Sequence, residues 1–368
     1  MMTLQQIFGQ EAAIGAIRRA LAHDCLAGAY LFVGAPGTGK GALADALASA
    51  ATCTAPVHPF DACGQCGSCR RLRAGTHPEV VRVSPAGEQT QIWQFWTRDN
   101  RDTPGVLSTT LCYAPVIGRR RVYILEQADT LTEAAANSLL KVLEEPPPYA
   151  LFLLRAPHTS HVLPTIVSRC QIVRVHPVPT DRLTDYLAQR FHMPADRAEA
   201  IAAYAEGKVG QAVRMAENPA IAAEIARVLD LAEGIPRAPR VRALRLAEQL
   251  RQCAAQLRAL PGGQADPISG DEGDTAPAKE KASRRTLLGC IDLLVIFYRD
   301  LLALSVSGAS ACVVNRDRVD RLARIAASAG PERWMYCLDA LLMARRRLEA
   351  NANVAMVTEA LMMALVGV

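Results

Sequence analysis

The sequence lacks a long uncharged apolar run, a strong charge imbalance and an internal repeat. Its most apolar stretch, from Leu287 onward, contains Asp292, Arg299 and Asp300, and these charges argue against a membrane span. The first residues also lack the apolar core and cleavage site of a secretory signal. We therefore expect a cytoplasmic protein, in which cysteines do not form a disulfide framework by default.

The composition is that of an ordinary globular protein. Half of the 368 residues are apolar and about a fifth are charged. The length is sufficient for two or three domains, each with its own core. The net charge of +5 permits a nucleic-acid partner without arguing for one, because the clustering of charge matters more than its total.

The first half of the chain has the pattern of a doubly wound α/β domain. Over residues 1–178, short β-branched runs alternate with helical stretches, which indicates a parallel sheet with crossover helices. The expected strands cover 29–35, 79–85, 120–127, 150–156 and 171–175.

The second half has only helical patterns. The proline-rich segment 176–180 is a predicted linker. A small helical domain is expected over 179–235, and a second helical domain over 236–368. Within the latter, residues 261–284 are rich in Gly, Pro, Asp and Lys, so we predict a disordered insertion there.

A glycine-rich segment between an expected strand and an expected helix has the pattern of a phosphate-binding loop. Glycines let backbone N–H groups turn toward phosphates, and a lysine reaches the outer phosphates. The motif ends in Ser or Thr, whose hydroxyl binds Mg²⁺, but glycine stands at that position here. We therefore expect phosphate binding to survive and metal-assisted hydrolysis to suffer. The loop consists of Gly34, Ala35, Pro36, Gly37, Thr38, Gly39, Lys40 and Gly41.

The strand expected over 120–127 resembles a Walker B strand, which in hydrolysing enzymes ends in Asp-Glu. Here the two positions are Glu126 and Gln127. A glutamate can still approach a metal, but a glutamine is neutral and cannot accept a proton from the attacking water. The change at both positions favours loss of the hydrolytic role.

Four cysteines lie close together in the sequence: Cys53, Cys63, Cys66 and Cys69. Four thiolates suit a structural, tetrahedral Zn²⁺, with no open position for catalysis. Iron–sulfur ligation is the rival interpretation, although the Cys-Pro of the ferredoxin pattern is missing. The nearby His58 and His77 are interpreted as solvated or capping side chains rather than ligands.

Arg169 lies in the segment Ser168-Arg169-Cys170, directly before the last expected strand. An arginine at a loop tip is usually part of a surface ion pair of small value. Alternatively, it is an arginine finger, which offsets the charge on a γ-phosphate bound by a neighbouring subunit. The residues alone leave both interpretations open.

Taken together, these motifs resemble a known family. The phosphate loop, the four cysteines, "THPEVVRV", "YAPVIGRRRVYILEQADTLTEAAANSLLKVLEEPPP" and "LPTIVSRC" follow in an order that resembles clamp-loader subunits of bacterial DNA polymerase III, which belong to the AAA+ class. The resemblance is strongest over residues 1–178. It implies a RecA-like AAA+ domain, a small helical lid domain and an all-α collar domain.

The resemblance also implies partners. Clamp-loader subunits form a pentamer of gamma/tau motor subunits, a delta subunit and one further subunit, and the pentamer loads a sliding clamp on primed DNA as part of the DNA polymerase III holoenzyme. In motor subunits an arginine on a later helix senses the nucleotide, whereas Gly210 falls at that position here. With Gly41 and Gln127, this favours a subunit whose own ATPase is weak or absent. Such a subunit lends Arg169 to its neighbour, while Lys40 still holds ATP or ADP.

Two alternatives remain open from the sequence. The first is a gamma/tau-type motor in which Glu126 and the backbone compensate for the lost groups. The second is a DNA-binding protein unrelated to clamps, in which Arg70, Arg71 and Arg73 beside the cysteines contact phosphates.

Overall fold

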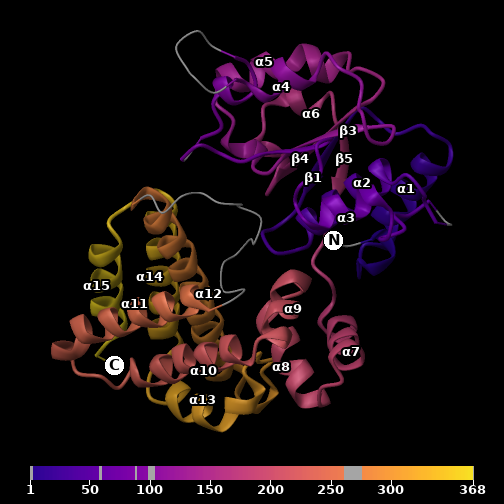
Figure 1. Ribbon diagram of the computed structural model, residues 1–368. Helices are drawn as coiled ribbons and strands as arrows, with labels where there is room; N and C mark the ends of the chain where they lie inside the picture. The colour runs from indigo at the N-terminus through magenta and orange to yellow at the C-terminus, as the bar shows by residue number, and fades with distance from the viewer. Residues whose placement is uncertain (1–2, 58–59, 88, 98–103, 261–275, 368) are drawn as a thin grey trace. The chain divides into compact units, whose positions relative to one another are not determined.

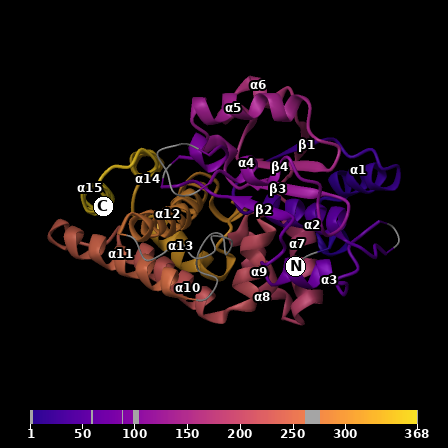
Figure 2. The ribbon, with the colours of Figure 1, turned by 45° about the horizontal axis from the view of Figure 1, so that its top comes forward.

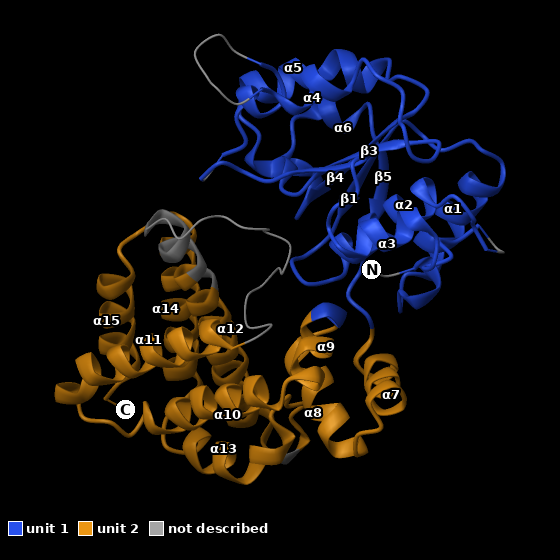
Figure 3. Cartoon of the chain, in the orientation of Figure 1, with its two compact units in different colours: residues 1–178, 208–210 blue, residues 179–207, 211–368 orange. Residues whose placement is uncertain are grey.

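The computed structural model describes residues 3–57, 60–87, 89–97, 104–260 and 276–367. It divides into two compact units (Figure 3). The first comprises Met1–Val178 with Lys208–Gly210, and the second comprises Pro179–Gly207 with Gln211–Val368. The finer division of the second half into a lid and a collar domain stays a prediction.

A five-stranded parallel sheet is the centre of the first unit (Figure 1). Its strand order is β2-β3-β4-β1-β5. Each expected strand is present, and β1, β3 and β4 are buried along their whole length. Such burial on both faces is what continuous apolar runs predict for a parallel sheet. The strands are β1 Ala29–Val33, β2 Val80–Val83, β3 Arg121–Leu125, β4 Ala150–Ala156 and β5 Gln171–Arg174.

Helices cover both faces of the sheet, since α1 and α2 lie on one side and α5 and α6 on the other (Figures 1 and 2). Successive β1 residues point to opposite faces, so Leu31 joins one apolar core while Tyr30 and Phe32 join the other. The helices of this unit are α1 Glu11–Ala22, α2 Lys40–Thr52, α3 Gly67–Arg73, α4 Val106–Thr110, α5 Glu133–Glu144 and α6 Pro164–Val167. Short 3₁₀ turns lie at Leu4–Gln6, Ile92–Gln94, Ala128–Thr130 and Thr159–His161.

The sheet topology brings the candidate residues to one edge. Because all strands are parallel, the loop after β1 and the residues after β3 leave the sheet at the same carboxyl edge. Strand β1 pairs with β4 so that Phe32 lies opposite Arg155, near the ends of both strands. The phosphate loop and Glu126 are therefore close in space although far apart in sequence.

Helices are the only regular elements among the described residues of the second unit, and α12 is its centre, packed against α10, α11, α13 and α14. Tyr298 of α12 and Trp334 of α14 are fully buried, with ring centroids 6.2 Å apart. The helices are α7 Thr180–Phe191, α8 Ala195–Ala205, α9 Val209–Glu217, α10 Pro219–Gly234, α11 Ala243–Ala259, α12 Ala276–Ser307, α13 Val319–Ala326, α14 Pro331–Glu349 and α15 Val354–Leu365. Further 3₁₀ turns lie at Arg240–Arg242, Gly308–Ser310 and Arg316–Arg318.

The charges in the apolar run of α12 have a structural explanation. Asp300 is fully buried, and its Oδ2 accepts hydrogen bonds from the backbone N–H of Val314, at 3.0 Å, and of Asn315, at 2.9 Å. The Asn315 side-chain amide donates to the same oxygen at 2.6 Å. Among the described residues, none of the helices is both long and apolar enough to span a membrane.

One predicted boundary needs correction. The insertion expected over 261–284 falls partly on residues 261–275, which lie outside the described residues. Residues 276–284, however, belong to helix α12 and are not a separate disordered segment. The stretch from Ala278 to Arg285 is made largely of Ala, Lys, Glu and Arg, which are good helix formers, and it runs directly into the apolar pattern of α12.

Candidate functional site

The phosphate loop has the expected setting between strand β1 and helix α2. Gly37 and Gly39 have φ angles of +82° and +106°, a region that other residues rarely adopt, which explains two of the glycines. The Lys40 ammonium donates to the carbonyl oxygens of Gly34, at 2.6 Å, and of Ala35, at 2.9 Å. The loop leads into the N-terminus of α2, a helix of 13 residues. At this end of the helix, backbone N–H groups and the helix dipole favour the binding of an anion.

Gly41 faces an arginine. A Cβ atom at this position would lie 2.5 Å from Nη1 of Arg155, closer than non-bonded atoms approach. Arg155 is the last residue but one of β4, in the apolar segment "ALFLLRA", and its side chain is 8% exposed. The space that a serine or threonine would need at position 41 is thus taken by a guanidinium.

Glu126, the residue after β3, is held by the groups around it. Its Oε1 lies 3.6 Å from Nη2 of Arg155 and 3.7 Å from Nη1 of Arg82. Its Oε2 accepts a hydrogen bond of 3.0 Å from Ser84 Oγ. Arg82 in turn donates to Asp45 of α2 at 2.7 Å. A carboxylate that could approach a metal is therefore engaged with two guanidinium groups.

The four cysteines come together in space. The Sγ–Sγ distances are 3.6 Å for Cys53–Cys63, 3.7 Å for Cys53–Cys69, 3.9 Å for Cys53–Cys66 and 4.0 Å for Cys63–Cys69. A tetrahedral site with Zn–S bonds of about 2.3 Å requires sulfurs about 3.8 Å apart, so this set fits one zinc ion. All four are free thiols, and the cluster could hold a metal ion.

Backbone N–H groups point at the sulfurs. Cys66 N–H lies 3.3 Å from Cys63 Sγ, and Cys63 N–H lies 3.4 Å from Cys53 Sγ. Burial raises the pKa of the Cys66 thiol, but hydrogen bonds from Thr54 and from the Cys69 N–H outweigh it and lower that pKa to about 5. Burial raises the pKa of Cys69. A bound cation would allow all four groups to be thiolates at neutral pH.

The cysteine segment is tied to the start of the chain by Asp61. This side chain is buried, and it accepts hydrogen bonds from the backbone N–H of Leu4, at 3.0 Å, and of Gln5, at 2.8 Å. The carboxylate of Asp61 thus satisfies donors of the first 3₁₀ turn, which have no partner within the turn itself.

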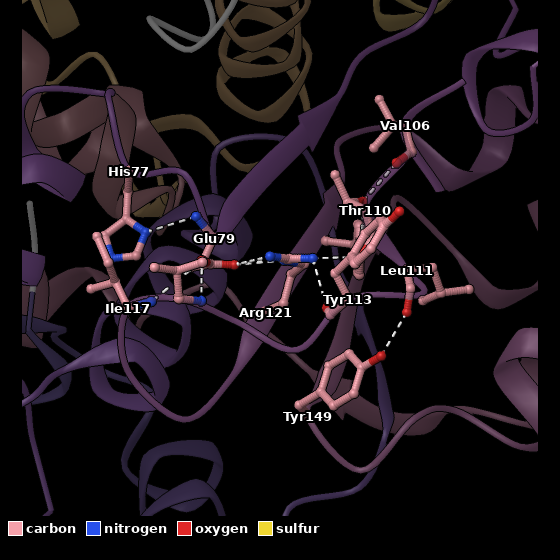
Figure 4. Close-up of polar contacts among 11 residues, drawn as sticks. His77, Glu79, Val106, Thr110, Leu111, Tyr113, Ile117, Arg121 and Tyr149 are labelled. Atoms are coloured by element: carbon pink, nitrogen blue, oxygen red, sulfur yellow. Dashed lines mark hydrogen bonds and ion pairs between the residues drawn. The ribbon is translucent and has the colours of Figure 1, made fainter. Parts of the chain in front are cut away.

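A buried polar network lies between the cysteine segment and the sheet (Figure 4). His77 Nδ1 accepts from the Glu79 N–H at 3.1 Å, and His77 Nε2 lies 2.8 Å from Ser68 Oγ, whose hydroxyl donates to the Thr52 carbonyl. Neutral His77 with its proton on Nε2 satisfies all of these contacts. His77 is 5% exposed, so of the two expected roles it is capping, here of the Glu79 N–H, that holds. His58 lies outside the described residues.

Glu79 continues this network toward β3. Its Oε2 lies 2.5 Å from Nη2 and 2.6 Å from Nε of Arg121, and both side chains are buried. Its Oε1 accepts from the N–H of Val116 at 2.7 Å, while Arg121 donates to the carbonyl oxygens of Thr110 and Tyr113 (Figure 4). The pair therefore fixes the loop before β3 against the sheet.

Arg169 lies at the surface, after helix α6. Its Nη2 is 3.3 Å from Glu144 Oε1, at the end of α5, and the two side chains are 30% and 59% exposed. Its Nη1 donates to the Thr165 carbonyl at 3.0 Å. An exposed pair of this kind is worth about 0–1 kcal/mol, so the guanidinium is available to a stronger acceptor.

Gly210 lies beside the phosphate loop within the first unit. Its N–H donates to the Gly37 carbonyl at 3.3 Å. A glycine here has no side chain to reach a phosphate. The three arginines of α3, Arg70, Arg71 and Arg73, are exposed.

Sequence reasoning missed Arg155, although a signal was present. An arginine inside an otherwise apolar strand must have a partner when it is buried, and this one finds Glu126. The aromatic run at 92–96, by contrast, is core packing, since Phe95 is buried and Ile92 and Trp96 pack around it.

Comparisons with known proteins agree with this picture. The family described as "DNA polymerase III, delta subunit" matches residues 9–179. DNA polymerase III subunit delta' of Bacillus subtilis is 28% identical over 331 residues, which cover 90% of this chain and 88% of that protein. Subunit delta' of Pseudomonas aeruginosa is 36% identical over 174 residues, which cover 47% of this chain and 50% of that protein.

Motor subunits match over a shorter part. DNA polymerase III subunit tau/gamma of Haemophilus influenzae is 32% identical over 188 residues, which cover half of this chain but only 25% of that protein. Of these relatives, delta' of Bacillus subtilis matches through both units, whereas the tau/gamma match covers half of this chain. The predicted α/β domain followed by helices is confirmed, and the chain is similar to DNA polymerase III clamp-loader subunits.

Proposed function

We propose that this chain acts as the delta' subunit of a DNA polymerase III clamp loader. In this role it assembles with gamma/tau motor subunits and a delta subunit into a pentamer that places a sliding clamp on primed DNA. It contributes Arg169 to the ATP site of the adjacent motor subunit and does not hydrolyse ATP itself. Motor-type turnover is the alternative that the experiments below distinguish.

The surface position of Arg169 carries this proposal. An arginine that acts in a neighbour's site must be exposed in the separate chain and weakly held there. Arg169 meets both requirements, because it is at the surface and forms an ion pair with the half-exposed Glu144. The γ-phosphate of a bound nucleotide carries more negative charge than one carboxylate, and the planar guanidinium can bind it through two N–H groups.

The chain's own nucleotide site supports the same division of labour. Gly41 offers no hydroxyl to a metal, Gln127 cannot act as a base, and Gly210 offers no sensing side chain. Lys40 and the loop glycines still provide donors for ATP or ADP phosphates. Nucleotide binding without turnover is the expected behaviour.

The cysteine cluster serves structure in this proposal. Cys53, Cys63, Cys66 and Cys69 would hold one Zn²⁺, which joins the end of α2 to the start of α3. Four thiolate ligands leave no open position on the ion, so it supplies rigidity and not chemistry.

The test is ATPase measurement on the loader reconstituted with motor subunits and delta. Arg169→Ala is expected to lower DNA-stimulated ATPase by about 10-fold or more while the pentamer remains assembled by size-exclusion chromatography. Arg169→Lys should restore little, because it keeps the charge but loses the planar fork.

Two matched variants serve as controls. Glu144→Gln releases Arg169 without removing it and should leave turnover at or above the natural level. Lys40→Ala should leave loader turnover unchanged, and the purified chain alone should hydrolyse ATP at background. Normal turnover with Arg169→Ala, or DNA-stimulated ATPase by the isolated chain that Lys40→Ala abolishes, would instead favour the motor interpretation.

A further inference from the structure

The part of the nucleotide site where a hydrolysing protein would bind its metal ion does not fit a metal in this chain. In a hydrolysing phosphate-loop protein, Mg²⁺ is held between the hydroxyl after the loop lysine and the acidic residue of the second strand. Here the first position is Gly41 and the second is Glu126. The Arg155 guanidinium contacts both, because Nη1 lies 2.5 Å from the Cβ that a side chain at 41 would have and Nη2 lies 3.6 Å from Glu126 Oε1.

We infer that Arg155 takes the place of the divalent cation, so that this phosphate loop binds nucleoside polyphosphate as the metal-free anion. The inference concerns the chain's own nucleotide site, and it does not depend on the role of Arg169.

Burial keeps the Arg155 guanidinium in place between position 41 and Glu126. Its side chain is 8% exposed, and its backbone is fixed in register with Phe32 in the middle of the sheet. A guanidinium stays protonated at all physiological pH values. A Mg²⁺ ion entering between Gly41 and Glu126 would face this positive charge within a few ångströms, in a region where charges are poorly screened.

The surrounding groups reinforce the exclusion. Arg82 adds a second positive charge 3.7 Å from Glu126 Oε1, and Ser84 donates to Oε2. The carboxylate is thus neutralised by fixed groups, whereas a metal site keeps its acidic ligand available. The phosphate oxygens of a bound nucleotide, by contrast, would be stabilised by the positive charges of Lys40 and Arg155 without a bound Mg²⁺.

Gly41 and Arg155 are therefore expected to be coupled. A threonine at 41 alone would push the guanidinium away from Glu126, while removal of Arg155 alone would leave no hydroxyl for a metal. Only a threonine at 41 together with the removal of Arg155 both frees the space for a metal ion and supplies a hydroxyl ligand. Without Arg155, Glu126 still has Arg82 and Ser84 as partners. A leucine at 155 should be tolerated, because it would extend the apolar sequence of Leu153 and Leu154 in the same strand.

The experiment measures ATP affinity of the isolated full chain in EDTA and in Mg²⁺ by isothermal titration calorimetry. The natural chain should bind ATP in EDTA within about threefold of its affinity in Mg²⁺. The double variant Gly41→Thr/Arg155→Leu should bind ATP at least about 10-fold more tightly with Mg²⁺ than with EDTA. Gly41→Thr alone should show no such gain. Arg19→Leu, the same change at an exposed arginine of α1, is the matched control and should behave like the natural chain.

The outcomes are distinguishable. Ten-fold tighter binding with Mg²⁺ in the natural chain, or in Gly41→Thr alone, would overturn the inference. A natural chain that binds ATP in neither condition would likewise overturn the inference. Thermal melts check folding of each variant, and Arg155→Gln replaces Arg155→Leu if the leucine variant does not fold. A loader that still needs Arg169 in any of these cases leaves the proposed function standing.

Discussion

Arg121 and Glu79 form an ion pair of 2.5 Å in which neither side chain is more than 8% exposed. The pair connects the segment after the cysteine cluster with strand β3, and each partner also satisfies backbone groups of the loop before β3. Buried charges of this kind depend strongly on each other.

Replacement of Glu79 should therefore be costly. Glu79→Gln leaves Arg121 buried without a counter-charge, and we expect a loss of about 3–5 kcal/mol in the free energy of unfolding. Urea denaturation followed by circular dichroism measures this loss. The control Asp24→Asn, in an exposed pair with Arg120, should cost less than about 1 kcal/mol. Equal effects of the two variants would contradict the assigned burial of the pair.

Metal content tests the cysteine cluster directly. Elemental analysis should find about one zinc per chain, and iron in its place would favour the rival interpretation. Cys66→Ser should lose the metal and lower the melting temperature, while Cys112→Ser, at an exposed lone cysteine, should keep both. Acidification should release the ion, because protons compete with it for the thiolates. A stable natural chain without metal would contradict the assignment.

His77 predicts a pH dependence of stability. Burial lowers the pKa of His77 below its ordinary value of 6.5. As the pH falls through 6.5, the unfolded chain takes up this proton before the folded chain does, so the folded state loses stability below 6.5 and keeps it fully above. Nuclear magnetic resonance of the metal-loaded protein should show the His77 ring taking up its proton at a pH below 6.5. Titration of His77 at or above 6.5 would disprove the neutral, buried ring.

Asp300 should anchor the loop that follows α12 in the second unit. Asp300→Ala removes the acceptor for two backbone N–H groups and for the Asn315 amide. We expect a loss of about 2–3 kcal/mol, measured by chemical denaturation. Asp317→Ala, at a largely exposed position in the same loop region, should change stability by less than about 0.5 kcal/mol and serves as the control.

The sheet was predictable because its inner strands β1, β3 and β4 are buried on both faces and appear in the sequence as short apolar runs. The cysteine spacing likewise predicted a cluster, since tight turns between close residues leave few other arrangements. Arg155 was not predictable as part of the site, because its position depends on how β4 pairs with β1 and how α2 packs on the sheet. The start of α12 was missed because acidic and proline residues of 261–275 dominate the composition of the predicted insertion.

The hydrogen bonds from Leu4 and Gln5 to Asp61 have a practical consequence. The backbone at Leu4 and Gln5 is held by the Asp61 carboxylate, which the cysteine segment positions. Loss of the metal ion from the cysteine cluster should therefore loosen the backbone at the start of the chain. Protease cleavage near Thr3, or a dye attached there, would act as an indicator for chelation without any probe on a ligand.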